Sequence, residues 1–397
     1  MHANSPRLFI EINKSDYIFS VCDNFKEQNS KLIIKYKAPI KGISSSQITD
    51  PNLVSAVLKE NIYIIEKKIG HTFKEVILII DNFDNFLINC SGFKKLNSSQ
   101  LQKDNIIHIL NSLKSLIDQN ENDKKLIHIF NTKFILDKKD LKNLPIGLFG
   151  DFYAHELSFF LIKLNDFKNI INIFKRCNIK IHKILSKSFL EGTVIINDNL
   201  DLETFFKIKI NKNNSQIFFF EKSSLKQLQN FHFGSDLIIK DISKITSIKI
   251  EDVKNILNHL KLSNENSEQQ FLEKEFFKNK NFRKIKKKLI IDIAKARINE
   301  IAQIILFKNI NFKNILKNKI KIFLDINCID DLFSLKEIFE HEFSNGQSLE
   351  LEFFKNSSYE TFITNTNRIV QFGWVKEAVP VIQEKKSIIS RLFNLLR

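Results

Sequence analysis

The sequence predicts an α/β protein of two lobes, in which a similar succession of strands and helices occurs twice. Short β-branched and aromatic runs separated by turn-like gaps occur near the amino terminus and again after residue 200. A helix and a later apolar strand follow these runs in each half. The length of 397 residues exceeds one ordinary domain, and 43% apolar residues suffice for a sizeable core, which excludes disorder as the main state.

The first half begins with three predicted strands, at residues 7–12, 17–22 and 31–36. A helix follows, with Asp50 as its N-cap, Pro51 at its first position and Gly70 at its end. The run Val76–Ile80 is apolar on every side, as expected of a buried parallel strand. The order strand, strand, strand, helix, strand is that of a ribonuclease-H-like half, the unit that is duplicated in the actin superfamily.

The second half repeats this order. Three strands are predicted at Thr204–Ile210, Gln216–Glu221 and Leu225–Phe233. A helix is predicted at Asp236–Ile245, and a later strand at Lys321–Leu324. The halves share no residue-level repeat, so the similarity is one of fold pattern.

Residues 83–160 interrupt this pattern and predict an inserted small α+β subdomain. A polar-rich helix is expected at Ser99–Leu116, and strands are expected around Leu126–Leu136 and Glu156–Lys163. After it, an amphipathic helix capped by Asn165 or Asp166 returns to the first lobe.

The composition is strongly basic, with 61 Lys and Arg against 45 Asp and Glu and a net charge of +16. Such a charge suits nucleic acid or an anionic membrane, although part of the lysine excess reflects AT-rich codons. The strongest basic run, Lys274–Lys288, contains interleaved aromatic residues. A solvated helix face is the favoured interpretation of this run, and single-stranded nucleic-acid binding is the alternative.

No catalytic or metal-binding constellation is predicted. The nine histidines form no HxxxH or HExxH spacing, and Asp236 and Asp241 are more typical of a helix start than of paired catalytic carboxylates. The cysteines lack CxxC spacing and fit a reducing cytosol; they are Cys22, Cys90, Cys177 and Cys328. No run approaches the roughly 20 apolar residues that span a bilayer, so any membrane contact is expected to be peripheral.

Several segments, in a specific order, resemble the FtsA family of actin-like bacterial division proteins. Leu126–Leu136 with Leu144–Gly150 is similar to a strand and the N-P-x-G-x-x-G motif of that family's inserted SHS2 subdomain, and Asp166–Leu190 is similar to the returning helix and strand. Phe233–Ile242 resembles V-G-G-D-x-x-x-x-D-I, and Ala296–Ile301 resembles the R-x-x-E-I helix.

The nucleotide loops depart from this family. The family's first phosphate loop corresponds to Glu11–Asp16, where this sequence lacks the glycine. The second corresponds to Lys209–Gln216, where this sequence lacks three glycines and both aspartates. The glycines beside the adenosine fall near Asp325–Asn327, and none is preserved. Asparagine tolerates positive φ, so a rescue of the loops is conceivable at Asn13, Asn211 and Asn213. ATP, the cofactor implied by the resemblance, is therefore doubtful here, and hydrolysis is not expected.

The resemblance implies several binding residues. Gly234, Ser235 and Asp236 are candidates for nucleotide contact, and Arg297 and Glu300 are candidates for holding the FtsZ C-terminal tail. The alternative for Arg297 is an intrahelical pair with Glu300. The basic run would then form an electropositive face for an acidic-flanked peptide.

The last eleven residues predict an amphipathic helix that binds an anionic membrane. On a helical projection the apolar side chains fall on one arc, and they are Ile388, Ile389, Leu392, Phe393, Leu395 and Leu396. Arg391 and Arg397 lie on the remaining arc, as at an anionic interface. The alternative is a terminal helix that docks on its own domain.

Together these features predict a two-lobed actin-like fold. The first lobe is formed by residues 1–82 and 161–190, the SHS2 subdomain by 83–160, and the second lobe by 191–375. A linker at 376–386 then leads to the membrane helix at 387–397. The expected function is a non-catalytic division adaptor at the cytoplasmic face of the inner membrane at the division site, which tethers FtsZ, self-assembles and contacts other division proteins. A PilM-like pilus adaptor is the alternative, followed by an ATPase with a remodelled pocket and then by a nucleic-acid binder.

Overall fold

The computed structural model divides the chain into two compact units. The first contains Met1–Asp198, Ser223–Lys226 and Ser357–Arg397, and the second contains Asn199–Lys222 and Gln227–Asn356. The structure describes residues 5–23, 30–44, 46–81, 83–259, 270–277, 283–317, 320–326, 332, 334–344, 349–354 and 358–378. The second unit is thus an insertion into the first, and the first is completed by the carboxyl-terminal part of the chain.

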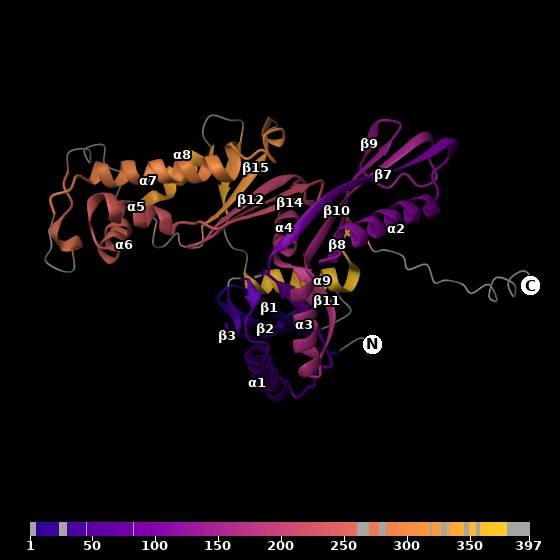
Figure 1. The fold of residues 1–397 in the computed structure, drawn as a ribbon, viewed down its shortest axis with the longest axis horizontal. Coiled ribbons are helices and arrows are strands. Elements are labelled where there is room, and N and C mark those ends of the chain that lie inside the picture. Colours follow the sequence, from indigo (N-terminus) through magenta and orange to yellow (C-terminus); the bar gives the residue numbers. More distant parts are fainter. Residues whose placement is uncertain are drawn as a thin grey trace, which may run out of the picture. The chain divides into compact units, whose positions relative to one another are not determined.

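The first unit is built on a five-stranded sheet in the order β11-β6-β1-β2-β3 (Figure 1). Its strands are β1 (Arg7–Ile12), β2 (Asp16–Cys22), β3 (Leu32–Pro39), β6 (Glu75–Ile80) and β11 (Lys180–Ser186). Strands β1, β6 and β11 are parallel, whereas β2 and β3 form antiparallel pairs. A two-stranded ribbon, β4 (Ile43–Ser44) and β5 (Gln47–Ile48), precedes the first helix.

Two pairs of helices cover this sheet: α1 (Pro51–Ile69) packs against α3 (Leu164–Arg176), and α4 (Lys187–Asp198) packs against α9 (Tyr359–Phe372). Because successive residues of β1 and β6 are buried, the sheet is covered on both faces. Helix α1 begins as predicted, since the Asp50 carboxylate accepts the N–H groups of Asn52 and Leu53. It ends at Gly70, whose φ of 68° is left-handed.

The inserted subdomain is a four-stranded antiparallel sheet in the order β7-β10-β8-β9, with one helix, α2 (Lys103–Asn120), on one face. Its strands are β7 (Asn85–Gln100), β8 (Lys124–Leu136), β9 (Lys139–Leu141) and β10 (Phe149–Lys163). Apolar residues of α2, including Ile109 and Leu113, share a core with Tyr153, Leu157 and Phe159. The predicted α+β insertion is therefore present, and its SHS2 identity stays a prediction.

The second unit contains a five-stranded sheet in the order β14-β13-β12-β15-β16, with β12 and β15 parallel. Its strands are β12 (Phe205–Ile210), β13 (Ser215–Glu221), β14 (Ser224–Phe231), β15 (Lys321–Ile326) and β16 (Glu350–Phe353). Its helices are α5 (Asp236–Thr246), α6 (Ile250–His259), α7 (Lys287–Ala302) and α8 (Lys336–Ser344), and a π-helical turn, Gln303–Phe307, extends α7. The helices and one face of the sheet share an apolar core.

The segment that follows α9 docks on the inserted subdomain. Ala378 N donates to Ile129 O at 2.8 Å, and Asn131 N donates to Lys376 O at 2.8 Å, so the segment forms a short antiparallel bridge with β8. The Glu377 carboxylate lies 2.7 Å from His128 Nδ1 and 3.0 Å from Lys183 Nζ. Burial acts to raise the pKa of Glu377, but its bonds to His128 and Lys183 outweigh burial and lower the pKa to about 2.

Several boundaries differ from the predicted ones. The predicted helix Ser99–Leu116 begins later, at Lys103, because β7 continues to Gln100. The predicted linker 376–386 begins with residues that pair with β8, and the predicted second lobe 191–375 loses α9 and most of α4 to the first unit. The reason is common to these cases: pairing and burial against distant strands leave no signal in the local sequence pattern.

Candidate functional site

Three charged side chains meet at the carboxyl edge of the first unit's sheet. Because β1, β6 and β11 are parallel neighbours, their carboxyl ends lie side by side, which is where open α/β sheets bind ligands. Glu11 lies in β1, Asp81 follows β6, and Lys187 opens α4 directly after β11. Lys187 Nζ lies 2.8 Å from Glu11 Oε1 and 3.4 Å from Asp81 Oδ2. These residues form an ion cluster.

The lysine of this cluster is charged and compensates a buried carboxylate. The Glu11 side chain is 1% exposed, and neither of its oxygens accepts a well-aligned hydrogen bond from the described residues, so the nearby Lys187 ammonium supplies the compensating charge. Burial acts to lower the pKa of Lys187, but Asp81, Glu11 and Glu191 outweigh it and hold that pKa well above its usual range.

Helix α9 contributes Tyr359 to the same edge. Its hydroxyl lies 2.8 Å from the hydroxyl of Ser20, and Lys35 Nζ lies 3.7 Å from the centre of its ring. Burial, together with the negative charge of Glu11, raises the pKa of Tyr359. The phenol is therefore neutral, and it lies close enough to the cluster to sense the charges of Glu11 and Lys187.

The hairpin between β1 and β2 carries the first predicted phosphate loop. Asn13 Oδ1 accepts the backbone N–H of Ser15 at 2.9 Å and that of Asp16 at 2.7 Å. The Ser15 hydroxyl donates to the Asp16 carboxylate at 2.6 Å. These backbone N–H groups are the donors that a phosphate would require, and the turn's own side chain accepts them.

The hairpin between β12 and β13 carries the second predicted phosphate loop, and it is closed in a different way. Its carbonyl oxygens face the start of α5: Asn211 O accepts the N–H of Ser235, and Lys212 O accepts the N–H of Asp236, both at 2.9 Å. A Cβ at Gly234 would lie 2.0 Å from Asn211 O, so only glycine permits this approach. The donors at the start of α5 are therefore bonded within the second unit.

A buried lysine also lies in the second unit's sheet. Lys207 of β12 is 1% exposed, and its Nζ lies 3.4 Å from Asp325 Oδ2 and 3.8 Å from the centre of the Phe354 ring. Asp325 is one of the positions expected beside adenosine, and Asn327 lies outside the described residues. The Asp325 carboxylate is therefore bound within its own sheet.

The structure separates the other predicted site residues. Gly234, Ser235 and Asp236 pack against the second hairpin, as described above. The guanidinium of Arg297 is already engaged, because it pairs with Glu300 on α7 and with Asp241 on α5. The predicted membrane-binding residues 388–397 lie outside the described residues, as does part of the basic run, residues 278–282. Asn13, Asn211 and Asn213 do not adopt positive φ, so the conceivable backbone rescue of the loops is absent at these positions.

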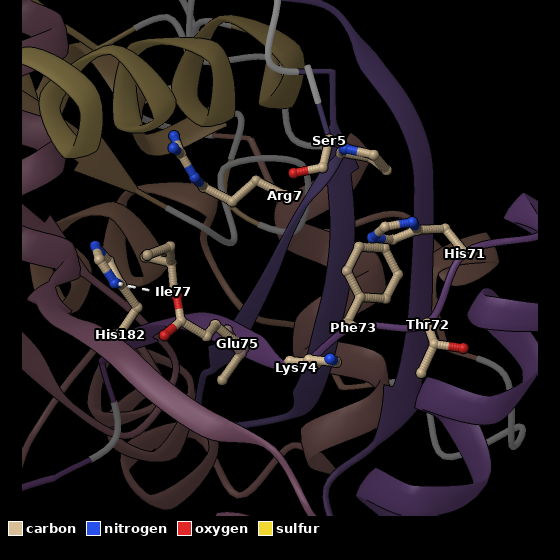
Figure 2. Close-up of a pocket in the computed structure, with 11 residues that line it drawn as sticks. Ser5, Arg7, His71, Thr72, Phe73, Lys74, Glu75, Ile77 and His182 are labelled. Atoms are coloured by element: carbon tan, nitrogen blue, oxygen red, sulfur yellow. Dashed lines mark ion pairs between the residues drawn. The ribbon is translucent and has the colours of Figure 1, made fainter. Parts of the chain in front are cut away.

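A cavity of about 460 Å³ lies at the opposite, amino edge of the first unit's sheet. Figure 2 shows His71 and Phe73 on one side of it and His182 with Glu75 on the other. The guanidinium of Arg7 is directed to α9, where it donates to Asn367 Oδ1. Polar and apolar groups are mixed in this lining, and the one cation of β1 is turned towards the helix rather than into the cavity.

Sequence reasoning missed Lys187 and Asp81. Asp81 directly follows the predicted parallel strand Val76–Ile80, and carboxyl ends of such strands share one edge, so this rule could have identified Asp81. Lys187 follows β11, for which no separate apolar strand was predicted. Among the described residues, no group of three His, Cys, Asp or Glu side chains could hold a metal ion. None of the described helices combines the length and apolar character needed to cross a bilayer.

No protein-family profile and no curated protein matches the sequence. Among solved structures, the chain is similar to the PilM-PilN type IV pilus biogenesis complex, with 9% identity and a TM-score of 0.55 over 87% of this chain and 88% of that chain. It is also similar to the ethanolamine utilization protein EutJ from Carboxydothermus hydrogenoformans, with 9% identity and a TM-score of 0.43 over 93% and 90% of the two chains. MreB5 of Spiroplasma citri bound to AMPPNP gives 11% identity and a TM-score of 0.43 over 92% and 96%.

The two units therefore constitute a two-lobed actin-like fold, which confirms the predicted fold class. Each unit contains the expected meander of three strands, followed by helices and a parallel strand. An identity of 9% shows the fold alone, and the resemblance to the FtsA family in particular stays a prediction.

Proposed function

We propose that this protein is an actin-like adaptor that links a protein assembly to a membrane and does not hydrolyse nucleotide. One observation carries the proposal: Asn13 Oδ1 accepts the N–H groups of Ser15 and Asp16, the donors of the first phosphate loop. A phosphate would have to replace these bonds and would meet the Asp16 carboxylate in the same turn. The Lys187 ammonium offers no alternative, because Glu11 and Asp81 already hold it.

A nucleotide titration tests this part of the proposal. Isothermal calorimetry of the full chain with Mg-ATP and Mg-ADP at millimolar concentration is expected to show no saturable heat. Tight binding that requires Mg²⁺ would overturn the proposal and would favour the ATPase with a remodelled pocket.

The first candidate for the assembly is the FtsZ filament, which follows from the resemblance to the FtsA family. In this proposal, the protein works at the cytoplasmic face of the inner membrane at the division site, and its terminal helix holds it there. A single short helix binds weakly, and self-assembled copies would gain avidity by presenting many helices together.

Arg297 provides the test of FtsZ binding. Its guanidinium pairs with Asp241 and Glu300, so a tail carboxylate would have to compete with both. Arg297→Glu should abolish binding of the FtsZ tail peptide in fluorescence anisotropy, whereas Lys295→Glu, an exposed change on the same helix, should not. Unchanged affinity of the Arg297 variant would remove this residue from the proposed site.

A second candidate is a pilus-assembly adaptor, and the likeness to the PilM-PilN complex favours it. The two candidates differ in the partner, so the same anisotropy assay with a PilN peptide distinguishes them. Binding of PilN without binding of the FtsZ tail would replace the first candidate by the second.

A further inference from the structure

The inserted subdomain exposes six large apolar side chains on and beside the strands β7 and β10. They lie in β7, in the loop before β10 and in the first residues of β10, and they are Phe93 (67% exposed), Leu144 (38%), Ile146 (51%), Leu148 (51%), Phe149 (69%) and Phe152 (39%). We call these six residues the apolar tip. Surface apolar residues are normal when they occur singly, whereas a gathered set of this size indicates a binding surface.

Contacts within the subdomain hold the tip residues in two neighbouring groups, Phe93 with Phe152 and the loop before β10 with the end of β7. The rings of Phe93 and Phe152 stack with their centres 5.6 Å apart, and Phe149 pairs with Gln100 in the register of β10 with β7. The loop before β10 is held close by, because Gly147 N donates to Leu101 O at 2.8 Å and Leu101 N donates to Leu148 O at 2.9 Å. The tip is thus a fixed surface built on the middle of β7, the start of β10 and the loop before β10.

Lysines surround the apolar tip. Lys95 lies opposite Phe152 in the strand register, and Lys94 precedes it in β7. Lys138 and Lys139 follow Asp137, whose carboxylate accepts the N–H of Phe152 at 2.8 Å. All four lysines are exposed. These four lysines outnumber the three nearby carboxylates, Asp137, Asp140 and Asp151, so the rim of the tip carries a small positive charge.

The pairing of exposed aromatic and aliphatic groups with lysine favours a lipid occupant over a protein. Lysine is depleted in protein interfaces, where arginine is enriched, whereas lysines beside an anionic bilayer keep their ammonium groups at the headgroups while apolar neighbours enter the interface.

The chain's carboxyl-terminal segment is anchored on the same subdomain. Lys376 Nζ donates to Lys142 O at 3.1 Å and lies 5.1 Å from the centre of the Phe134 ring. Eight residues separate Ala378 from Ser387, so the predicted terminal helix begins within about 30 Å of Ala378. A bilayer that binds this helix therefore lies within reach of the subdomain.

We infer that the apolar tip is a second membrane-contacting surface, which inserts Phe93, Ile146 and Phe149 among the headgroups of an anionic bilayer while the surrounding lysines contact lipid phosphates. This inference rests on the proposed membrane-linking function and adds a fixed contact to the terminal helix. Two contacts on one chain bind with higher avidity than either does alone. A fixed second contact would also set which face of the protein is turned to the membrane.

Vesicle co-sedimentation of the full chain tests the inference, with vesicles of phosphatidylglycerol and phosphatidylethanolamine compared with phosphatidylcholine alone. The tip variant Ile146→Ser with Phe149→Ser should lose about tenfold in affinity for anionic vesicles, because two partly buried apolar groups are removed. The matched control, Tyr63→Ser with Ile310→Ser, removes one aromatic and one aliphatic group that are exposed elsewhere, and this variant should bind like the wild type. Lys94→Gln with Lys95→Gln should weaken binding mainly at low salt.

A helix variant, Leu392→Glu with Phe393→Glu, separates this inference from the proposed function. If the tip variant binds like the wild type, the inference is wrong and the proposed function stands. If the helix variant binds like the wild type, the terminal helix is not the anchor, while a loss in the tip variant still supports the inference. An oligomer that dissociates in the tip variant without lipid, together with unchanged vesicle binding, would identify a second copy as the occupant and overturn the inference.

Discussion

The two lobes contain corresponding hairpins, and each hairpin is closed by a different kind of group. In the first lobe, the side chain of Asn13 accepts the N–H groups of its own turn. In the second lobe, backbone carbonyls of Asn211 and Lys212 accept the N–H groups at the start of α5. The first solution needs one asparagine, and the second needs the absence of a side chain at Gly234. Gly234 is thus required by the close packing of the hairpin against the start of α5.

The lobes also differ in the surroundings of a lysine that is paired with a carboxylate. Lys187 lies at the carboxyl edge of its sheet and joins two carboxylates, whereas Lys207 lies within its strand and joins Asp325 and the face of Phe354. The two lysines occupy different positions in their lobes, and their charges are stabilised by different contacts. Substitutions that act on one lobe alone test this comparison.

The largest effect is expected from Lys187→Met. This change leaves the Glu11 carboxylate buried without its cation and should lower the free energy of unfolding of the first unit by about 3 kcal/mol. Denaturant unfolding followed by the fluorescence of Trp374, the only tryptophan, reports on this unit. Adding Glu11→Gln should recover part of the loss, and Lys37→Met, an exposed change in β3, should have little effect. An undiminished stability would show that the cluster contributes nothing.

Acid should also destabilise the first unit, by a somewhat smaller amount. His155 is fully buried in the inserted subdomain, its Nε2 lies 2.9 Å from Asn131 Oδ1, and its Nδ1 has no partner among the described residues. Burial lowers the pKa of His155 to about 4, so the unfolded chain binds the proton more tightly than the folded one. Stability is therefore fully present above pH 6.5 and falls as the pH drops towards 4, by about 2 to 3 kcal/mol.

His155→Phe is the control for this pH dependence. The variant should unfold with a flatter stability profile between pH 6.5 and 4.5, a range chosen because Glu377 titrates below it. Equal slopes in the variant and the wild type would assign the acid response to other groups.

Local pattern predicted much of the fold but little of the site. The caps of α1 at Asp50 and Gly70, and the strands β12 and β13, are visible in the sequence because they depend on neighbouring residues. Strand β7 was missed because only Leu96 of its residues is fully buried, so apolar alternation is weak. The contacts of Lys187 and Glu377 join residues far apart in the chain, and no local pattern encodes them.

Gly234→Ala should destabilise the second unit and leave the first nearly unchanged. The new Cβ would lie within 2.7 Å of two carbonyl oxygens of the hairpin, so the hairpin must move away from α5, at a cost of about 2 kcal/mol. Hydrogen exchange should increase at Ser235 and Asp236, whose N–H groups lose their acceptors. Gly147→Ala, where a Cβ meets no atom within 4 Å but φ is 86°, should cost about 1 kcal/mol in the first unit only. Unchanged exchange at α5 would contradict the proposed role of Gly234.

The smallest effect is expected from Asn13→Ala. The N–H groups of Ser15 and Asp16 would lose their acceptor but could bond to water at this exposed turn, so about 1 kcal/mol should be lost. The informative readout is ligand binding: calorimetry with inorganic phosphate should show a gain relative to the wild type if Asn13 occupies the donors. No gain would show that Asp16 alone is sufficient to exclude phosphate.

Along the chain, the second unit is inserted into the first, and this order has a consequence for synthesis. Residues 199–222 and 227–356 leave the ribosome before α9, which packs on β2, β3 and α4. The second unit thus has all its strands and helices while the first still lacks the helix that covers part of its sheet. Until residue 378 is made, the edge of β8 around Ile129 and Asn131 also remains unpaired and open to other chains. Translation thus begins with the unit that contains the amino terminus, and that unit is also completed last.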